Sequence, residues 1–349
     1  MEMEDVALSK PLVLPVSREE ERRCFGFGGV VSPGLTAREK KLICVTGGNS
    51  YLGSSVVKEL LARGYLVRVI IENPVEFEDV KEMMGDEELN LLESVVVAKM
   101  GDLESLCDAF RGCHAVFHTS SFIDPHGISG YTEQMVFLET EGARNVMEAC
   151  YEAAYVKRCI FTSSLLASIW RGENVGGRVD ENSWSSEEFC RENKLWLALG
   201  KTNAEKVAWT KSRELRVNLV TVCPGLLMPP TSSSGLAETS SPYLKGGRIM
   251  LQKGLLAVAD MKKVAEAHVH IYEAMDYGAC GRYLCFEKVV RRLNEATDLE
   301  NKLKMPGSLS RGGQGTISED ADEEIENNIS NSKLARLLLQ ASQYISCKE

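Results

Sequence analysis

The sequence lacks the features of several large classes of protein. Its 349 residues contain no run of about eighteen apolar residues, the length that a membrane-spanning helix needs. The 11 cysteines form no Cys-x-x-Cys pair, and with only 5 histidines there is no Cys/His cluster at metal-ligand spacing. A net charge of −10 disfavours nucleic acid or an anionic membrane as the main partner. The sequence therefore predicts no metal, nucleic-acid or membrane partner.

The composition is that of an ordinary globular protein, 44% hydrophobic and 26% charged, and is enough for one large or two modest domains. Most cysteines lie in apolar runs such as CIFTSS and LVTVC, where cysteine acts as a small core residue. Such usage is typical of a reduced compartment. The first residues, MEMEDVALSK, are acidic and lack the order of a signal peptide. We therefore expect a cytoplasmic protein.

Short apolar runs alternate with helical patterns over residues 40–224. This alternation predicts an α/β fold with a doubly wound, mostly parallel sheet and right-handed crossovers. The expected strands are 42–46, 66–71, 94–98, 114–118, 157–162 and 217–222. The expected helices are 52–63, 103–110, 131–154 and 194–213.

Four segments flank this core. Residues 1–39 have no sustained period and are predicted to form a poorly ordered extension. Residues 225–304 have a looser pattern, which suggests a smaller substrate-binding lobe over the carboxyl edge of the sheet. The stretch 305–332 is polar, glycine-rich and acidic, so it is predicted to be a disordered linker. Residues 333–349 contain an amphipathic helix, which we expect to dock on the protein's own body, with a partner as the alternative.

The segment LICVTGGNSYLG at 42–53 reads as a buried strand, a tight turn and the start of a helix. Gly47 permits the turn, Gly53 lets the helix approach the strand, and backbone N–H groups can then meet a pyrophosphate. Ser50 stands where the middle glycine of a G-x-x-G-x-x-G spacing is expected. The next strand ends in Glu72, nineteen residues past Gly53, which suits the adenosine ribose of a dinucleotide. The alternatives are a plain strand–helix connection and a solvated acid at a strand end.

Several short blocks fall in one order along residues 40–300: TGGNSYLG, GDLES, AVFHTSS, VKRCIFTSS, LGKTNAEK, VTVCPG, VAEAHV and GRYLC. Together they resemble the extended short-chain dehydrogenase/reductases, most closely the plant cinnamoyl-CoA reductase and dihydroflavonol reductase group. VFHTSSFIDP, FTSSLLASIWR, DENSWSSEEFCRENKLW and VTVCPGLLMPP resemble its defence-associated, cinnamoyl-CoA reductase-like branch. The resemblance implies a Rossmann-type sheet. It also implies hydride transfer from a nicotinamide dinucleotide to an acyl-CoA thioester, an aldehyde or a ketone, in phenylpropanoid or defence-related metabolism.

The resemblance assigns roles to individual residues. The pyrophosphate would be held by Gly47, Ser50, Tyr51, Leu52 and Gly53. The adenine would contact Asp102 and Leu103, and the nicotinamide end would contact Thr119, Ser120, Lys201 and Pro224. Ser164, or its neighbour Ser163, would polarise the substrate carbonyl. From the pattern alone, these serines could equally cap a strand end, and Lys201 could be an exposed helix lysine.

One departure concerns the proton donor. The family's mechanism needs Tyr-x-x-x-Lys, because this spacing puts a phenol and an ammonium on one helix face. In this chain Leu197 stands four residues before Lys201, and the indole N–H of the adjacent Trp196 cannot shuttle a proton near neutral pH. Tyr131, His118 or water are the possible substitutes. Two functions stay open: a reductase, and a catalytically impaired cofactor-binding protein that acts through protein partners.

A second departure concerns the choice of cofactor. Relatives that use NADPH carry a basic residue at the end of the second strand, where this chain has Glu72, which would repel a 2′-phosphate. Arg68, four residues earlier, would compensate only by reaching the ribose. The sequence therefore favours NAD(H) over NADP(H). It leaves the substrate open, because the predicted lobe is the least patterned part of the chain.

Overall fold

The computed structural model describes residues 12–14, 41–121, 131–172, 177–228, 242–305, 307, 309 and 324–346. Most of the predicted extension at 1–39 and of the predicted linker at 305–332 lies outside these residues. No helix in the described part of the chain is long and apolar enough to cross a membrane.

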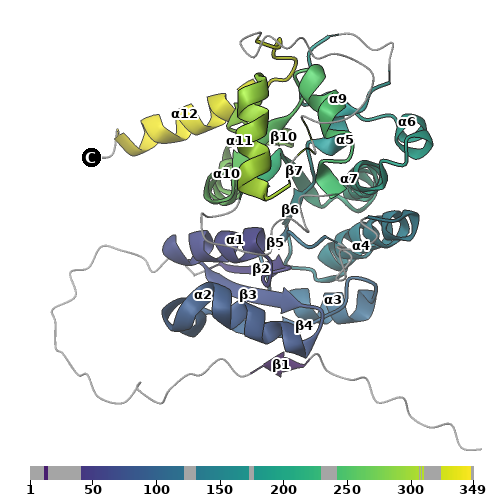
Figure 1. Cartoon of the computed structure of the whole chain (residues 1–349). Helices are drawn as coiled ribbons and strands as arrows, with labels where there is room; N and C mark the ends of the chain where they lie inside the picture. Colours follow the sequence, from purple (N-terminus) through teal and green to yellow (C-terminus); the bar gives the residue numbers. More distant parts are fainter. Residues whose placement is uncertain are drawn as a thin grey trace, which may run out of the picture.

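An eight-stranded sheet forms the centre of the protein (Figure 1). Its strands, in spatial order, are β1 (Val13–Leu14), β4 (Ser94–Val97), β3 (Leu66–Ile71), β2 (Leu42–Thr46), β5 (Ala115–His118), β6 (Arg158–Thr162), β7 (Asn218–Pro224) and β10 (Gly281–Cys285). Every neighbouring pair is parallel except β1 with β4. The chain runs outward in both directions from β2, so the carboxyl ends of β2 and β5 form the switch point where such sheets bind ligands. The predicted doubly wound parallel sheet is confirmed.

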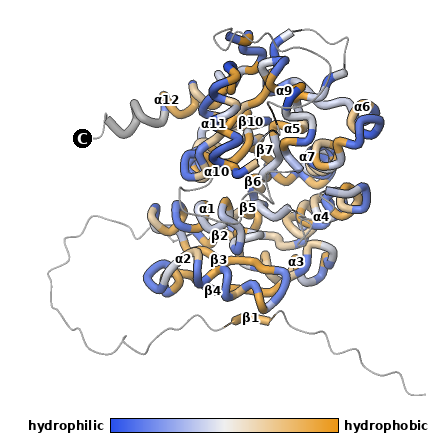
Figure 2. Tube along the Cα trace, viewed as in Figure 1, coloured by the Kyte–Doolittle hydropathy of each residue, from blue (hydrophilic) through white to orange (hydrophobic). Residues whose placement is uncertain are grey.

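Helices cover both faces of the sheet because both faces are apolar. In β2, Ile43 and Val45 face one core cluster and Cys44 faces the other. The first face is covered by α1 (Tyr51–Ala62), α2 (Phe77–Leu91), α10 (Met261–Ala274) and the start of α12 (Ser332–Ser346). The second is covered by α3 (Leu103–Phe110), α4 (Glu133–Glu152) and α7 (Trp196–Leu215). In Figure 2 the central strands are largely orange, whereas much of α2 and α6 is blue.

A smaller lobe sits at one end of this body (Figure 1). It contains a three-stranded sheet in the order β11 (Lys288–Val289), β9 (Ala257–Asp260), β8 (Leu226–Met228). Its helices are α5 (Leu166–Ile169), α6 (Glu187–Glu192), α9 (Gly247–Gln252) and α11 (Leu293–Leu303). Two single 3₁₀ turns, η1 (Pro74–Glu76) and η2 (Met275–Tyr277), complete the described elements.

The structure differs from the predicted lobe boundary at 225. Strand β10 pairs with β7 in the main sheet, and α10 packs against α1 on the first face of that sheet. Both elements fall inside the range 225–304 but belong to the body that the main sheet forms. The lobe in turn takes α5 and α6 from within 40–224, so the two parts interleave along the chain.

Residues 324–332 also differ from the disorder predicted for them. Ile329 is 0% exposed, forms a β-bridge with Val179 and shares its apolar cluster, and Ile325 packs on the same cluster. These two isoleucines supply the apolar anchors that the polar composition of the segment hides. Leu334 then begins α12 by packing into the core of the main sheet, so this helix starts on the protein's own body. At the other end of the chain, β1 shows that residues 13–14 pair with the sheet edge rather than being poorly ordered.

His268 ties α10 to the sheet at a point with no access to water. The residue is 0% exposed, with Nδ1 2.7 Å from the Val264 carbonyl oxygen and Nε2 2.9 Å from Thr162 Oγ1. Because a carbonyl can only accept, Nδ1 carries the hydrogen and Nε2 accepts from the threonine, and the ring is neutral. Burial lowers the pKa of His268 from 6.5 to about 4.

Acidification is therefore expected to remove about 3 kcal/mol of unfolding free energy through His268. The unfolded chain binds this proton near pH 6.5 and the folded chain only near pH 4, so the contribution is constant above pH 6.5 and is lost as the pH falls between the two values. Urea unfolding of the protein and of His268→Asn between pH 7 and pH 4 checks this. The stability difference between the two proteins should shrink toward low pH, and a pH-independent difference would contradict the assignment.

Candidate functional site

The turn between β2 and α1 is built as the sequence predicts. Gly47 has a φ of +66°, a conformation that favours glycine. At Gly53 a Cβ would lie 2.1 Å from the Gly47 carbonyl oxygen, so no larger residue lets the helix come this close. Ser50 is the N-cap of α1: its hydroxyl donates to the Gly47 carbonyl at 2.7 Å and accepts from the Gly53 N–H at 3.0 Å. The serine side chain is thus folded into the turn.

The first turn of α1 retains free donors. Within the described ranges, no acceptor lies against the backbone N–H groups of Tyr51 and Leu52. These donors add to the positive end of the helix dipole at the switch point of the sheet. The Leu52 side chain is buried below, whereas Tyr51 is 36% exposed. This end of α1 therefore suits the pyrophosphate of a dinucleotide.

Two acids lie along the same edge, where the sequence predicts contacts with the adenosine. Glu72 follows β3 directly and is half-buried; burial, and then the neighbouring Glu76, raise its pKa. Its carboxylate accepts a hydrogen bond from the Met100 backbone, just after β4. Asp102 is exposed and caps α3, accepting from the backbone N–H groups of the next turn at 3.1 and 3.3 Å. Leu103 is half-buried against the core. Both carboxylates thus lie beyond the carboxyl ends of neighbouring strands.

Arg68 does not join this site. Its guanidinium pairs with Glu93 at 3.1 Å and donates to the carbonyl oxygens of Ala109 and Arg111 at the end of α3. The residue sits beside Ser94, at the start of β4, whereas the site lies at the other end of that strand. The prediction that Arg68 helps to bind the cofactor is therefore wrong, since its donors stabilise the C-terminus of α3 at the amino ends of the strands.

The ends of β2 and β5 are locked together at the switch point. Thr119 Oγ1 donates to the Thr46 carbonyl at 2.6 Å, and the Thr119 and Ser120 N–H groups approach Thr46 Oγ1 at 3.2 and 3.4 Å. Ser120 lies directly beneath Gly47, where a Cβ would meet it at 2.9 Å. His118 is buried with its Nδ1 2.9 Å from Thr46 Oγ1, and burial lowers its pKa to about 4. His118 is therefore neutral near pH 7.

Ser163 and Ser164 have different surroundings at the end of β6. The Ser163 hydroxyl donates its hydrogen to the buried carboxylate of Glu205 at 2.7 Å, so this hydrogen is not available to a ligand. In the described part of the chain, Ser164 Oγ accepts a hydrogen bond from the Leu166 N–H at 3.2 Å, and its own hydroxyl hydrogen meets no acceptor there. Pro224, at the end of β7, accepts from the Leu165 N–H at 2.8 Å and so borders the same edge. Of the two serines, Ser164 is the one whose hydroxyl can donate to a carbonyl oxygen.

Lys201 is buried rather than exposed on the helix. Its ammonium lies 2.5 Å from Glu139 Oε1, and the two side chains are 10% and 4% exposed. Leu197, one turn earlier on α7, is half-buried against apolar neighbours, and Trp196 packs on the same cluster. Tyr131 donates to Glu139 Oε2 at 3.0 Å; burial and this carboxylate raise its pKa far above the usual value. Tyr131 thus lies near the lysine but is a weak acid.

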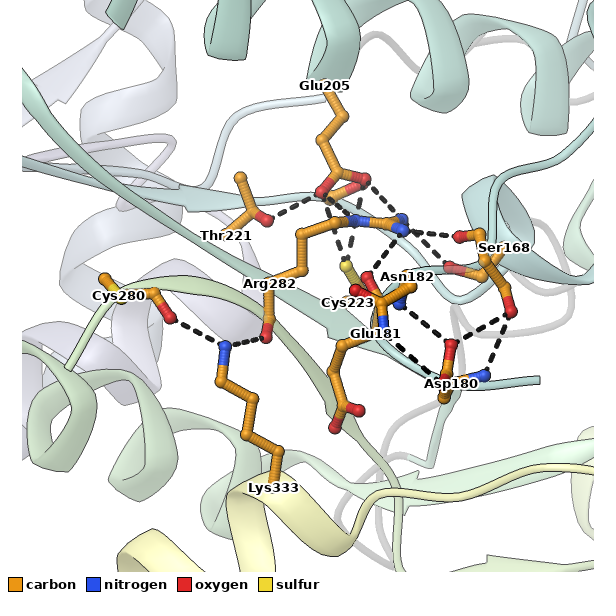
Figure 3. A network of polar contacts seen from close by, with 12 residues as sticks. Ser168, Asp180, Glu181, Asn182, Glu205, Thr221, Cys223, Cys280, Arg282 and Lys333 are labelled. Carbon is orange, nitrogen blue, oxygen red and sulfur yellow. Dashed lines mark hydrogen bonds and ion pairs between the residues drawn. The ribbon is translucent and has the colours of Figure 1, made fainter. Parts of the chain in front are cut away.

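A second buried ion pair joins α7 to strand β10 of the main sheet (Figure 3). Glu205 is 0% exposed and meets Arg282 of β10 through two hydrogen bonds of 2.8 and 3.0 Å. The same carboxylate accepts from Ser163 and from Thr221 of β7. Arg282 also donates to Ser168 and to backbone carbonyls at 181 and 183. This network fixes the strand that carries the candidate serines against α7.

Sequence reasoning missed Glu139 and Glu205. A signal for both was present, because each acid falls inside the apolar stripe of its helix. On α4 the buried positions include Val136, Glu139 and Ala143, at spacings of three and four. An acid at such a position must have a buried partner, although the stripe does not say which one.

Comparisons with known proteins agree with this geometry. Residues 44–218 match the model of the 3-beta hydroxysteroid dehydrogenase/isomerase family. The chain is 36% identical over 262 residues to cinnamoyl-CoA reductase 1 of Petunia hybrida, an alignment that covers 72% of this chain and 74% of that protein. Its fold is similar to that of vestitone reductase from alfalfa (Medicago sativa), with a TM-score of 0.60 and 23% identity over 85% of this chain and 92% of that one. It is also similar to yeast methylglyoxal/isovaleraldehyde reductase Gre2 complexed with NADPH, with a TM-score of 0.65 and 19% identity over the same shares. The chain therefore belongs to the extended short-chain dehydrogenase/reductases, a family of oxidoreductases, with cinnamoyl-CoA reductases among its relatives.

Proposed function

We propose that this protein is a slow nicotinamide-dependent reductase of an acyl-CoA thioester, an aldehyde or a ketone, of the kind used in phenylpropanoid or defence-related metabolism. The observation that carries the proposal is the intact dinucleotide edge: the Gly47–Gly53 turn, the free N–H groups of α1 and an acid after β3. The named activity of the Petunia relative supports the acyl-CoA substrate class.

Each residue of the edge has a definite task in this proposal. The N-terminus of α1 holds the pyrophosphate, and Glu72 accepts from the adenosine ribose. Lys201 keeps donors for the nicotinamide ribose, since an ammonium has three and Glu139 takes one. Ser164 donates to the substrate carbonyl and so stabilises the charge that develops on its oxygen. The bound cofactor supplies the hydride, and water supplies the proton that a tyrosine gives in relatives.

A catalytically impaired cofactor-binding protein that acts through protein partners is the second candidate. Leu197 favours it, because no phenol stands one turn before Lys201 and general acid catalysis typically contributes about 10²–10⁴-fold. Initial rates with hydroxycinnamoyl-CoA esters and the matching aldehydes, measured at high enzyme concentration, separate the two. Turnover that Ser164→Ala abolishes supports the reductase. Saturable cofactor binding without turnover on any of these substrates supports the second candidate.

We expect NADH to bind about tenfold more tightly than NADPH. The Glu72 carboxylate would repel the 2′-phosphate, and Arg68 cannot offset this repulsion because it pairs with Glu93. Calorimetry with both nucleotides at low salt measures the ratio, and Glu72→Gln should bring the two affinities close together. Asp79→Asn, a change of charge on the nearby helix α2, serves as the control and should leave the ratio unchanged. Tighter binding of NADPH would overturn this preference and would point to Lys99, whose charge acts on Glu72, as the phosphate ligand.

A further inference from the structure

Glu139 places a carboxylate where helix α4 is otherwise packed into the protein. The residues one turn away on either side, Met135 and Ala143, are buried, and Glu139 itself is 5% exposed. Burying a charge is costly unless it is paired and hydrogen-bonded. The pairing is with Lys201, whose Nζ lies 2.5 Å from Glu139 Oε1.

The second carboxylate oxygen of Glu139 is hydrogen-bonded as well. Tyr131 donates its phenol hydrogen to Glu139 Oε2 at 3.0 Å, and Ser121 approaches the same oxygen at 3.3 Å. The Tyr131 ring lies against Gly200, where a Cβ would meet the phenol oxygen at 2.7 Å, so the ring rests on α7 directly beside the lysine. Lys201 thus holds one carboxylate oxygen, and Tyr131 and Ser121 hold the other. The carboxylate cannot move away from the ammonium without breaking the hydrogen bonds to these two hydroxyls.

This pairing changes what the lysine can do. An ammonium that stands alone repels the positive charge of an oxidised nicotinamide ring and makes a neighbouring hydroxyl more acidic. A buried ion pair has no net charge, so it repels the oxidised ring much less and makes a neighbouring hydroxyl much less acidic. The neighbouring His118 is neutral and does not restore a positive charge.

We propose that Glu139 is a positioning residue that holds the Lys201 ammonium inside the protein and cancels its charge at the nicotinamide end of the site. The oxidised and reduced cofactors then bind with similar affinity, and a hydroxyl beside Lys201 is not made acidic. The proposal rests on the proposed function, because it places the nicotinamide beside Lys201.

The charge effect is tested by calorimetry with NAD⁺ and NADH on the wild type and on Glu139→Gln. The glutamine keeps the shape and hydrogen-bonding capacity of the side chain but removes its charge. The affinity for NAD⁺ should fall about fivefold or more relative to that for NADH. Glu141→Gln is the matched control, since Glu141 lies on the same helix and pairs with Arg144 at a half-exposed position. If Glu139→Gln shifts both affinities equally, or neither, the charge-cancelling role is wrong.

The holding role is tested without any cofactor, by thermal unfolding of Glu139→Ala, Lys201→Met and the double variant. Glu139→Ala leaves a buried ammonium without its partner and should lower the melting temperature by about 5 °C or more. Adding Lys201→Met should recover at least half of that loss. Strictly additive losses would show that Glu139 does not hold Lys201. If the wild type binds neither nucleotide, both the proposed function and the charge-cancelling role are wrong. The melting temperatures of the three variants still test whether Glu139 holds Lys201.

Discussion

Leu197→Tyr combined with Glu139→Gln is expected to raise reductase turnover about 10²-fold or more above the wild type. The tyrosine would stand one helical turn before Lys201, and removal of the Glu139 charge would free the ammonium to acidify its phenol. Leu197→Tyr alone should give a smaller gain, because the lysine is then still neutralised by Glu139 at 2.5 Å. The measurement is the initial rate of NADH oxidation with a hydroxycinnamoyl-CoA ester or its aldehyde. Leu197 is half-buried rather than enclosed, so the larger ring should cost little stability.

Two further variants decide what such a gain means. Leu197→Phe in the Glu139→Gln chain adds the ring without its hydroxyl and should give no gain. Lys201→Ala in the double variant should abolish the gain, because the phenol loses its cation. If the wild type already turns over as fast as the double variant, another group supplies the proton and Leu197 is not the defect. If no variant turns over although NADH binds, the substrate side of the pocket has diverged and the non-catalytic function is favoured.

Glu205→Ala is expected to lower the free energy of unfolding by about 3–5 kcal/mol. Glu205 is 0% exposed, and its removal leaves the Arg282 guanidinium buried without its counter-charge. Ser163 and Thr221 lose their acceptor in the same step. Denaturant unfolding followed by circular dichroism measures the loss.

Glu214→Ala is the matched control for this prediction. Glu214 lies near the end of the same helix, 55% exposed, and pairs with Lys211, so its removal should cost less than about 0.5 kcal/mol. Adding Arg282→Met to Glu205→Ala should restore part of the lost stability, because the stranded charge is then gone. A loss below about 1 kcal/mol for Glu205→Ala would show that the network in Figure 3 adds little to folding.

The sequence predicts the nucleotide half of the fold well because its patterns are local. Strands β2 and β3 occupy the predicted residues, and the turn from Gly47 to Gly53 forms for the reasons read from the sequence. Helix α2 was missed, since its sequence is mostly polar and it is kinked at Gly85, where φ is 76°. Strand β10 and helix α10 were assigned to the wrong part of the protein, because their pairing with β7 and α1 joins segments far apart in the chain.

Some features of the candidate site could likewise be predicted from local sequence, and others could not. Glu72 and Asp102 follow strand ends, so their edge could be predicted, whereas the direction of the Arg68 side chain along β3 could not. The partner of Lys201 was also beyond prediction, since Glu139 lies 62 residues away in the chain and on another helix. The absence of a tyrosine at position 197 was visible from spacing alone. What that absence does to the chemistry depends on Glu139, which only the packing of α4 on α7 reveals.

The central claim is that a nicotinamide dinucleotide binds across the carboxyl ends of β2 and β5, and amide hydrogen exchange with and without NADH tests it most directly. At saturating NADH, exchange should slow in peptides that cover residues 46–54 and 117–121, where the α1 donors and the locked strand ends lie. Helix α12, which among the described residues packs on α10 and β10 and not on the turn between β2 and α1, should exchange at the same rate with and without NADH. Unchanged exchange at 46–54 and 117–121, or protection confined to other segments, would contradict the account.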